Sequence, residues 1–176
     1  FLRVSAVLRE MSVRFCREIL GLTGAAALLG EIERRNLFLT RFGDDGRATY
    51  RYHKLFRDFL QKRLQQIDPG THEALHRRAG SWFEERHDVE EAVYHYLAAG
   101  AYSRATALMD QVALEWFTRG RVEALRRWAE ALPKKIRPQA PRLALYHSKL
   151  LTDRYMFEGA RDALVHAEAG LCGEKD

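Results

Sequence analysis

Long apolar runs are absent from this sequence of 176 residues, and cysteine and proline are scarce. No stretch approaches the roughly 20 apolar residues that a membrane-spanning helix needs, and no signal-peptide pattern opens the chain. The two cysteines, Cys16 and Cys172, are far apart in the sequence and do not have the spacing of a metal site. This cysteine usage is typical of a reduced, cytoplasmic protein, and we expect no contact with a membrane.

The motifs of common catalytic and nucleotide sites are also missing. The sequence contains neither the phosphate-binding motif G-x-x-x-x-G-K-[ST] nor the Gly-x-Ser-x-Gly of serine hydrolases. Cys16 falls on a predicted helix without a nearby partner, and the acidic pairs Glu84–Glu85 and Glu90–Glu91 fall on predicted solvent faces. We therefore predict no catalytic site, and we expect that the chain alone neither binds nor hydrolyses ATP.

His72 and His76 have the i, i+4 spacing that can hold a metal ion on one helix face. A third ligand is not evident, although folding could bring His87 or His95 close to the pair. We interpret the two side chains as capping or solvated histidines and predict no metal site.

Apolar residues make up 47% of the chain, which is enough for a core and argues against intrinsic disorder. The net charge is +5, and residues 1–60 hold 11 basic against 7 acidic side chains, whereas the remainder holds 18 against 17. This excess is modest for a nucleic-acid-binding protein. The sequence opens on Phe1 within a helical pattern, so we expect a piece of a longer protein.

Three short helical patterns and then two strand patterns occupy the N-terminal part. Ser12 is a predicted N-cap of the second helix, and the third runs over about residues 25–35. Its predicted inward residues are Leu28, Leu29 and Ile32.

The strands are predicted at residues 37–42 and 48–52, around the turn Gly43–Asp44–Asp45–Gly46, because Asp and Gly supply the backbone conformations of such turns. Three helices followed by a hairpin predict a winged helix domain, with the hairpin as the wing.

After the hairpin, the sequence predicts only helices. The first begins in RYHKLFRDFL (residues 51–60), and its apolar residues recur at the spacing of an amphipathic helix. They are Leu55, Phe56, Phe59, Leu60 and Leu64. Asp68–Pro69–Gly70 interrupts the pattern, and Thr71 is a predicted cap of the next helix.

Two later sets of small and large residues have the offsets of tetratricopeptide helical hairpins, in which small side chains let antiparallel helices approach. The first set is Gly80, Phe83, Ala92, Tyr96 and Ala99, and the second is Ser148, Ala160, Leu164 and Ala167. A less regular pair of helices is predicted between them, over residues 103–117 and 122–132. The segment PKKIRPQAP, residues 133–141, reads as a connector. We therefore predict a mainly α protein: a winged helix with one β-hairpin, followed by antiparallel helical hairpins.

Several segments together resemble the large MalT-like regulators of the LuxR group: FLRVSAVLREM, LLGEIERRNLFLTRF, YRYHKLFRDFLQKRL, LHRRAGSWFEERHDVEEAVYHYLAAGAYSRATALM, GRVEALRRWAEALP and PRLALYHSKLL. The resemblance implies a signal-transducing ATPase with a nucleotide-binding domain, a winged helix, a helical arm, a tetratricopeptide sensor and a C-terminal DNA-binding domain. It implies three parts here: a winged helix over residues 1–66, an arm over 67–138 and the start of the sensor over 139–176.

The resemblance also implies a role for His53, at the junction between the second strand and the next helix. In related switch ATPases, a Met-His-Asp-like motif ends the winged helix, and its histidine contacts the β-phosphate of bound ADP. Tyr52–His53–Lys54 occupies that position, with Lys54 in place of the aspartate. A histidine N–H can donate to a diphosphate. This contact would hold the winged helix and the nucleotide-binding domain in a closed arrangement, which ATP would open. The alternative is a ring that only satisfies a local backbone group.

A direct DNA-binding role for the third helix is another possibility, with Arg34, Arg35 and Asn36 facing DNA. Glu31 and Glu33 on the same helix oppose it, as do Asp44 and Asp45 at the tip of the wing, because acidic groups repel phosphates. A protein contact is the preferred interpretation of the winged helix.

Trp116 and Trp128, with Arg121 in the nearby basic cluster, are candidate partner-binding residues of a groove in the repeats. The predicted function is regulatory: the winged helix responds to the nucleotide state of an ATPase domain in cis, and the repeats receive a small-molecule inducer or a regulatory protein. The whole protein would self-associate and bind DNA through a C-terminal domain that is missing here. A winged helix that binds DNA and a passive tetratricopeptide scaffold are the alternatives.

Overall fold

Helices account for most of the computed structural model, which describes residues 1–35, 38–43 and 48–172. The chain divides into two compact units, Phe1–His87 and Asp88–Asp176, referred to below as unit 1 and unit 2. Within the described residues there is one two-stranded antiparallel sheet, so the predicted mainly α fold with one β-hairpin is confirmed.

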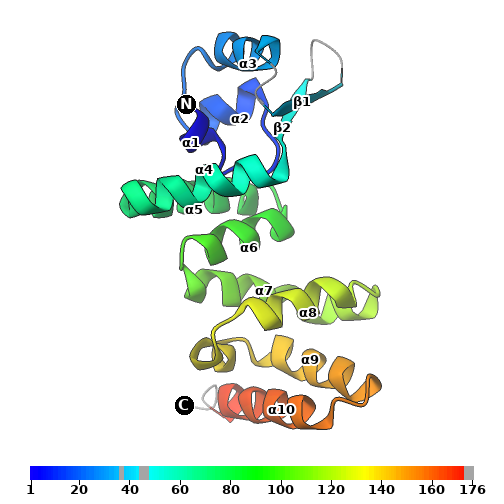
Figure 1. Cartoon of the computed structure of the whole chain (residues 1–176). Helices are drawn as coiled ribbons and strands as arrows, with labels where there is room; N and C mark the ends of the chain where they lie inside the picture. Colours follow the sequence, from blue (N-terminus) through cyan, green and yellow to red (C-terminus); the bar gives the residue numbers. More distant parts are fainter. Residues whose placement is uncertain (36–37, 44–47, 173–176) are drawn as a thin grey trace. The chain divides into compact units, whose positions relative to one another are not determined.

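Unit 1 begins with three short helices, followed by the hairpin and two longer helices (Figure 1). The helices are α1 (Leu2–Ser5), α2 (Val13–Glu18), α3 (Ala25–Arg34), α4 (Lys54–Ile67) and α5 (Pro69–Glu84), and the strands are β1 (Leu39–Phe42) and β2 (Thr49–Tyr52). The order of elements agrees with the predicted winged helix. The predicted turn residues Asp44, Asp45 and Gly46 lie outside the described residues, as do Asn36 and Leu37.

The hairpin is fixed to the rest of unit 1 through β2. Its register pairs Leu39 with Tyr52 and Phe42 with Thr49. On the other side of β2, the backbone N–H of Met11 donates to the carbonyl of Tyr50 at 2.7 Å, and the reverse bond measures 2.6 Å. The buried hydroxyls of Tyr52 and Ser5 lie 2.9 Å apart. These bonds hold the end of β2 in place, immediately before His53.

The helix caps explain where several elements start. Ser12 caps α2 as predicted, because its hydroxyl accepts the N–H of Phe15 at 3.1 Å. The cap of α5 is Asp68 and not Thr71: the Asp68 carboxylate accepts the N–H of Thr71 at 2.9 Å, with Pro69 in the first turn. A proline tolerates this position because its missing N–H would have no helical partner there.

One inward residue of α3 was predicted wrongly. Leu29 and Ile32 are buried, but Leu28 is 41% exposed. The buried residues of this helix are Ala25, Leu29 and Ile32, spaced by four and three positions, and Leu28 lies beside that narrow stripe.

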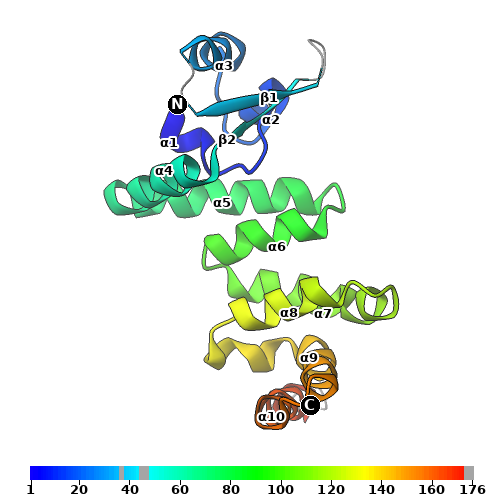
Figure 2. The same cartoon turned by 45° about the vertical axis from the view of Figure 1, so that its right-hand side comes forward.

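Unit 2 is a series of helices in which successive elements contact one another (Figure 2). They are α6 (Val89–Ala98), α7 (Tyr102–Thr118), α8 (Val122–Ala131), the 3-10 helix η1 (Lys134–Gln139), α9 (Pro141–Asp153) and α10 (Phe157–Cys172). The predicted connector of residues 133–141 is therefore mostly the 3-10 helix η1. The Arg137 Nε supports it by donating to the carbonyl of Leu132 at 3.2 Å.

Most of the small and large residues expected in the hairpins are buried. Ala92, Tyr96 and Ala99 are buried in unit 2, together with Ser148, Ala160 and Ala167, whereas Leu164 is 47% exposed. The division at His87 and Asp88 falls inside the predicted arm of residues 67–138. The domain boundaries after residues 66 and 138, and the tetratricopeptide assignment, stay predictions.

Candidate functional site

His53 stands at the junction of β2 and α4, where it is the N-cap residue. Its backbone is fully engaged: its N–H donates to the carbonyl of Phe38 at 2.8 Å, and its carbonyl accepts the N–H of Arg57 at 3.0 Å. The N–H bond continues the hairpin ladder by one residue, and the carbonyl bond opens α4. The backbone at His53 therefore has a fixed position between strand and helix.

The imidazole of His53, by contrast, is exposed and forms no capping hydrogen bond with α4. Within the described part of the chain, it has no hydrogen bond or ion pair. The alternative in which the ring satisfies a local backbone group is therefore not what the structure contains. A histidine with a fixed backbone and an unengaged ring is available to a ligand or partner.

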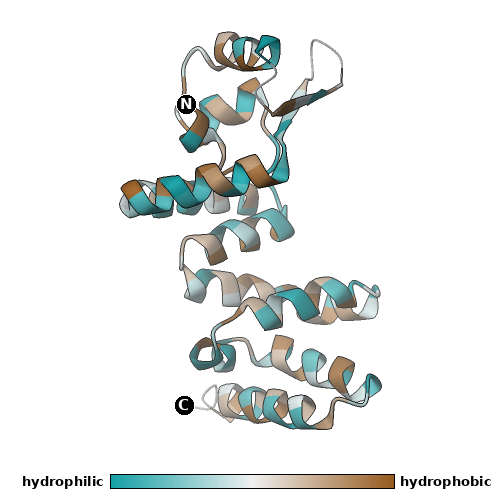
Figure 3. Cartoon of the chain, in the orientation of Figure 1, coloured by the Kyte–Doolittle hydropathy of each residue, from teal (hydrophilic) through white to brown (hydrophobic). Residues whose placement is uncertain are grey.

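Three exposed apolar side chains accompany His53: two follow it on α4, and one belongs to the residue opposite it in the hairpin. Leu55 is 72% exposed, Phe59 is 61% exposed, and Phe38, whose carbonyl holds the His53 N–H, is 62% exposed. Figure 3 shows hydrophobic turns alternating with hydrophilic ones along α4. The inward face of this helix contains Leu60 and Leu64, which are buried. Leu55 and Phe59 therefore form a second apolar surface that unit 1 itself does not use.

Phe38 has a left-handed backbone with φ of 53°, which bulky side chains rarely adopt. Its ring centroid lies 5.2 Å from that of Phe56, and the Phe56 ring packs edge-on against Tyr52 at 5.6 Å. An aromatic ladder thus runs from the buried Tyr52 to the exposed Phe38. Strained backbone conformations of this kind persist only where the surrounding structure holds them, and they cluster at binding sites.

The basic residues at the end of α3 are engaged locally. Arg35 Nε lies 2.6 Å from Glu31 Oε1, and Arg34 pairs with the other oxygen of the same carboxylate. These are exposed pairs of small energetic value, in which the single carboxylate of Glu31 is shared by both arginines. Asn36, the third residue of the predicted DNA-facing set, lies outside the described residues.

Trp116, Trp128 and Arg121 come together in unit 2. The two indole rings stack at 4.5 Å and are each 6% exposed, and the Arg121 guanidinium lies 3.8 Å from the centre of the Trp116 ring. Arg121 and Arg127 also bind opposite oxygens of Glu90, at 2.8 and 3.0 Å. Of the three predicted residues, only Arg121 is exposed, and the partner-binding role of the two buried tryptophans stays a prediction.

His72 and His76 lie with their ring centroids 4.6 Å apart in unit 1. Burial, with a smaller contribution from His72, lowers the pKa of His76 to about 3, so its ring is neutral. No group of three or more His, Cys, Asp or Glu side chains able to hold a metal occurs in the residues that the structure describes.

The sequence of the first unit can be assigned by comparison. Residues 1–72 match the MalT winged helix domain family, which covers the three helices, the hairpin, His53 and α4. This part is a MalT-like winged helix domain. The whole chain is 31% identical over 176 residues to the HTH-type transcriptional regulator MalT of Cronobacter sakazakii, of which it spans 19%. The predicted MalT-like character is confirmed.

A second relative differs in its named activity. The serine/threonine-protein kinase PknK of Mycobacterium tuberculosis is 42% identical over 113 residues, which are 63% of this chain and 10% of the kinase. The MalT-like chain thus spans between a tenth and a fifth of the relatives that it matches.

In the described residues, no helix is long and apolar enough to cross a membrane.

Sequence reasoning identified His53 but not the apolar surface beside it. Leu55 and Phe59 have the same helical spacing as the buried Leu60 and Leu64, so hydropathy alone cannot separate the two sets. The available signal was the width of the apolar face: at about 100° per residue, Leu55 and Leu64 lie roughly 180° apart around the helix, which is wider than one narrow contact stripe.

Proposed function

We propose that this chain is the regulatory portion of a MalT-like transcriptional regulator. In this proposal, the MalT winged helix domain contacts a nucleotide-binding domain elsewhere in the same protein and senses whether ADP or ATP is bound. Unit 2 belongs to the helical repeats that receive an inducer or a regulatory protein. The chain itself carries no catalytic residues; nucleotide hydrolysis and DNA binding belong to other domains.

The exposed, unpartnered ring of His53 is the observation that carries this proposal. A diphosphate needs a charge-assisted donor held in a fixed place, and an imidazole N–H on a fully hydrogen-bonded backbone provides one. Because the ring has no partner within the described residues, binding a phosphate there would break no existing bond. Lys54, at the position of the motif aspartate, pairs with Asp58 at 3.3 Å, so its side chain is directed along α4.

The apolar surface next to His53 supports a protein partner rather than a nucleotide alone. Leu55, Phe59 and Phe38 are all more than 60% exposed, and exposed apolar side chains favour burial against another surface. A nucleotide-binding domain in cis would cover them and bring its bound ADP to His53. Opening of this contact would expose them again, which provides a route to self-association of the whole protein.

The two relatives are named for different activities, and this difference supports a coupling role for the segment that they share. One relative is named as a transcriptional regulator and the other as a protein kinase, yet both contain a region similar to this chain. A segment common to proteins with different outputs is better suited to control than to the output itself. The proposal therefore places DNA contact outside this chain.

The test joins this chain to its native upstream nucleotide-binding domain and compares wild type with His53→Ala. We expect ADP to dissociate about tenfold faster from the variant, which corresponds to the loss of one charge-assisted hydrogen bond. We also expect the variant to self-associate without inducer. ADP release is measured by stopped-flow with a fluorescent analogue, and association by analytical ultracentrifugation.

Lys54→Ala is the matched control, because it removes a neighbouring exposed cation from the same junction. It should leave ADP release close to the wild-type rate. Equal ADP retention in wild type and His53→Ala would remove the phosphate contact from the proposal and favour a passive scaffold. Salt-dependent binding of the isolated chain to duplex DNA would favour the alternative of a DNA-binding winged helix.

A further inference from the structure

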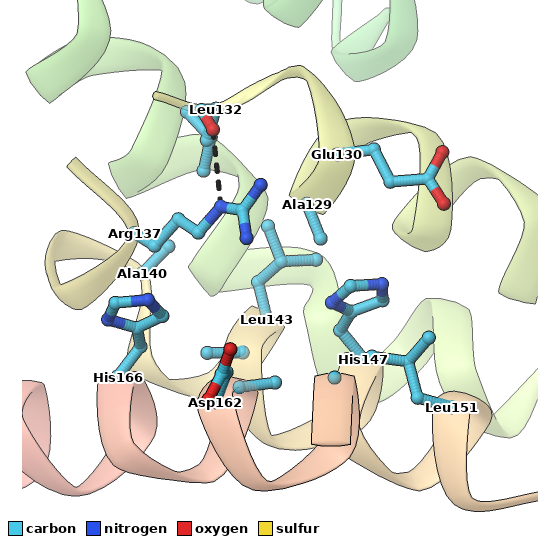
Figure 4. Close-up of a pocket in the computed structure, with 13 residues that line it drawn as sticks. Ala129, Glu130, Leu132, Arg137, Ala140, Leu143, His147, Leu151, Asp162 and His166 are labelled. Atoms are coloured by element: carbon cyan, nitrogen blue, oxygen red, sulfur yellow. Dashed lines mark hydrogen bonds between the residues drawn. The ribbon is translucent and has the colours of Figure 1, made fainter. Parts of the chain in front are cut away.

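A cavity of about 210 Å³ lies within unit 2, between α8, η1, α9 and α10 (Figure 4). Its volume corresponds to roughly seven water molecules, and it exceeds the ~150 Å³ cavity that accepts benzene in a protein core. The buried apolar residues that line its wall include Leu132, Leu143, Ala144 and Leu151. The cavity therefore has room for one small organic molecule with an apolar part.

Two oppositely charged side chains of this wall have no ion-pair partner within the described residues. Arg137 uses only its Nε, which donates to the carbonyl of Leu132, so its terminal nitrogens remain unengaged. Asp162 of α10 is exposed and forms no ion pair or hydrogen bond. The third charged residue of the wall, Glu130, differs because both of its oxygens accept from Arg126 at 2.6 Å. One free cation and one free anion thus face the same cavity.

His147 is the polar group of the interior. Its side chain lines the cavity and is 7% exposed, and its Nε2 is buried without a hydrogen-bond partner. Burial, together with the positive charges of Arg137 and Arg126, lowers the pKa of His147 against the opposing effect of Glu130, so the ring is neutral. An unsatisfied buried nitrogen is costly in a folded protein unless something donates to it or accepts from it.

The placement of these groups suits a molecule that has both charges at one end. In Figure 4, Arg137 and His166 lie on the left of the cavity, His147 and Leu151 lie on the right, and Asp162 lies below and between them. Arg137 and Asp162 are more exposed than the buried leucines, so charge lies toward the opening and apolar surface toward the interior.

We propose that this cavity binds a small zwitterion, an α-amino acid with an apolar side chain of about the size of leucine. The carboxylate pairs with Arg137, the ammonium pairs with Asp162, and the side chain occupies the space beside Leu143 and Leu151. An ammonium hydrogen near His147 also satisfies its Nε2. This inference deepens the proposed role of the repeats as the receiver of an effector. The regulatory meaning of the binding rests on that proposed function, whereas the binding itself does not.

The experiment titrates L-leucine into the full 176-residue chain and follows binding by calorimetry and by the ring signals of His147 in NMR spectra. Two analogues isolate each charge: 4-methylpentanoate lacks the ammonium, and 3-methylbutylamine lacks the carboxylate. We expect saturable binding of leucine and about tenfold weaker binding of each analogue, because each loses one charge pair. The His147 signals should shift with leucine.

Two variants assign the charges. Asp162→Asn should weaken leucine binding by about tenfold and leave 4-methylpentanoate unaffected, whereas Arg137→Gln should weaken both by about the same factor. Glu168→Gln on α10 and Arg142→Gln on α9 are the matched controls: both residues are exposed and neither lines the cavity. Circular dichroism confirms that each variant is folded.

Three outcomes overturn the proposal. They are no leucine binding by the folded wild-type chain, equal affinity for 4-methylpentanoate, and equal weakening by the control variants. None of these measurements involves a nucleotide or His53, so this inference and the proposed coupling function can fail independently of each other.

Discussion

Three of the histidines, His53, His76 and His147, lie in different environments, and their chemistry differs accordingly. The ring of His53 is exposed and unpartnered on a fixed backbone, that of His76 is fully buried and neutral, and that of His147 is buried on the wall of a cavity. Burial penalises the charged form of the other two rings and lowers the pKa of both His76 and His147. Only the first is suited to an anionic partner at neutral pH.

The two cysteines differ in the same way. Cys16 is fully buried in unit 1, and burial raises the pKa of its thiol to about 11, whereas Cys172 is exposed. Since the thiolate is the reactive form, we expect a thiol reagent at neutral pH to modify Cys172 rapidly and Cys16 only after unfolding. Mass spectrometry of the native and denatured protein checks this, with Cys172→Ser as the control. Rapid modification of two thiols in the native protein would contradict it.

At the scale of elements, the short helix α2 depends on its cap. Ser12→Ala removes the acceptor of the Phe15 N–H, and we expect the free energy of unfolding to fall by about 1 kcal/mol. Ser12→Asn keeps an acceptor at the cap and should retain most of the stability. Denaturant unfolding followed by circular dichroism measures both. If the two variants are equally stable, the capping bond is not what sets the start of α2.

The contact of α10 with η1 depends on a glycine. A Cβ at Gly170 would lie 2.3 Å from the carbonyl oxygen of Pro138 and 2.8 Å from the Cβ of Pro141, both of which belong to stiff segments. Gly170→Ala should therefore destabilise the chain by about 1–3 kcal/mol through overpacking.

Gly159→Ala in the same helix is the control. There the nearest atom, the Leu151 Cδ1, lies at 3.4 Å and can yield, so the substitution should be neutral or stabilising, by at most about 1 kcal/mol of helix propensity. Thermal unfolding of both variants decides the matter. Equal melting temperatures would show that η1 moves away from α10 without loss of stability.

At the scale of the whole molecule, buried neutral histidines make stability depend on pH. Burial lowers the pKa of His72 and His147, and lowers that of His76 to about 3, with the neighbouring His72 contributing. The unfolded chain binds these protons near pH 6.5, while the folded chain resists them. The contribution of these neutral histidines to the folding stability is therefore fully present above about pH 6.5. It is lost as the pH falls toward their folded pKa values.

We expect the free energy of unfolding to decrease by up to about 1.4 kcal/mol per pH unit for each such histidine below about pH 6.5. His76→Gln keeps a polar side chain that does not titrate in this range, so its stability should depend less steeply on pH. Urea unfolding at several pH values measures the slopes. Equal slopes for wild type and His76→Gln would assign the acid sensitivity to the other histidines.

Local sequence signals predicted the elements of this chain well. Helical spacing, the Ser12 cap and the strand patterns each act over a few residues, and they led to α2, α3, β1 and β2 within a few positions. The position of His53 between strand and helix followed from the same patterns. Its suggested role came from resemblance to a family, because one histidine at a junction does not by itself indicate a phosphate.

Tertiary packing decided what the local patterns could not. Leu28, Leu55 and Phe59 have the hydropathy of core residues, but they are exposed because neighbouring positions already fill the available contact surface. Trp116 and Trp128 are buried against each other, which depends on how α7 and α8 meet. The cavity needs four elements at once, and Arg137 and Asp162 are 25 positions apart in the sequence. Such groups come together only when the helices pack, because no local periodicity relates them.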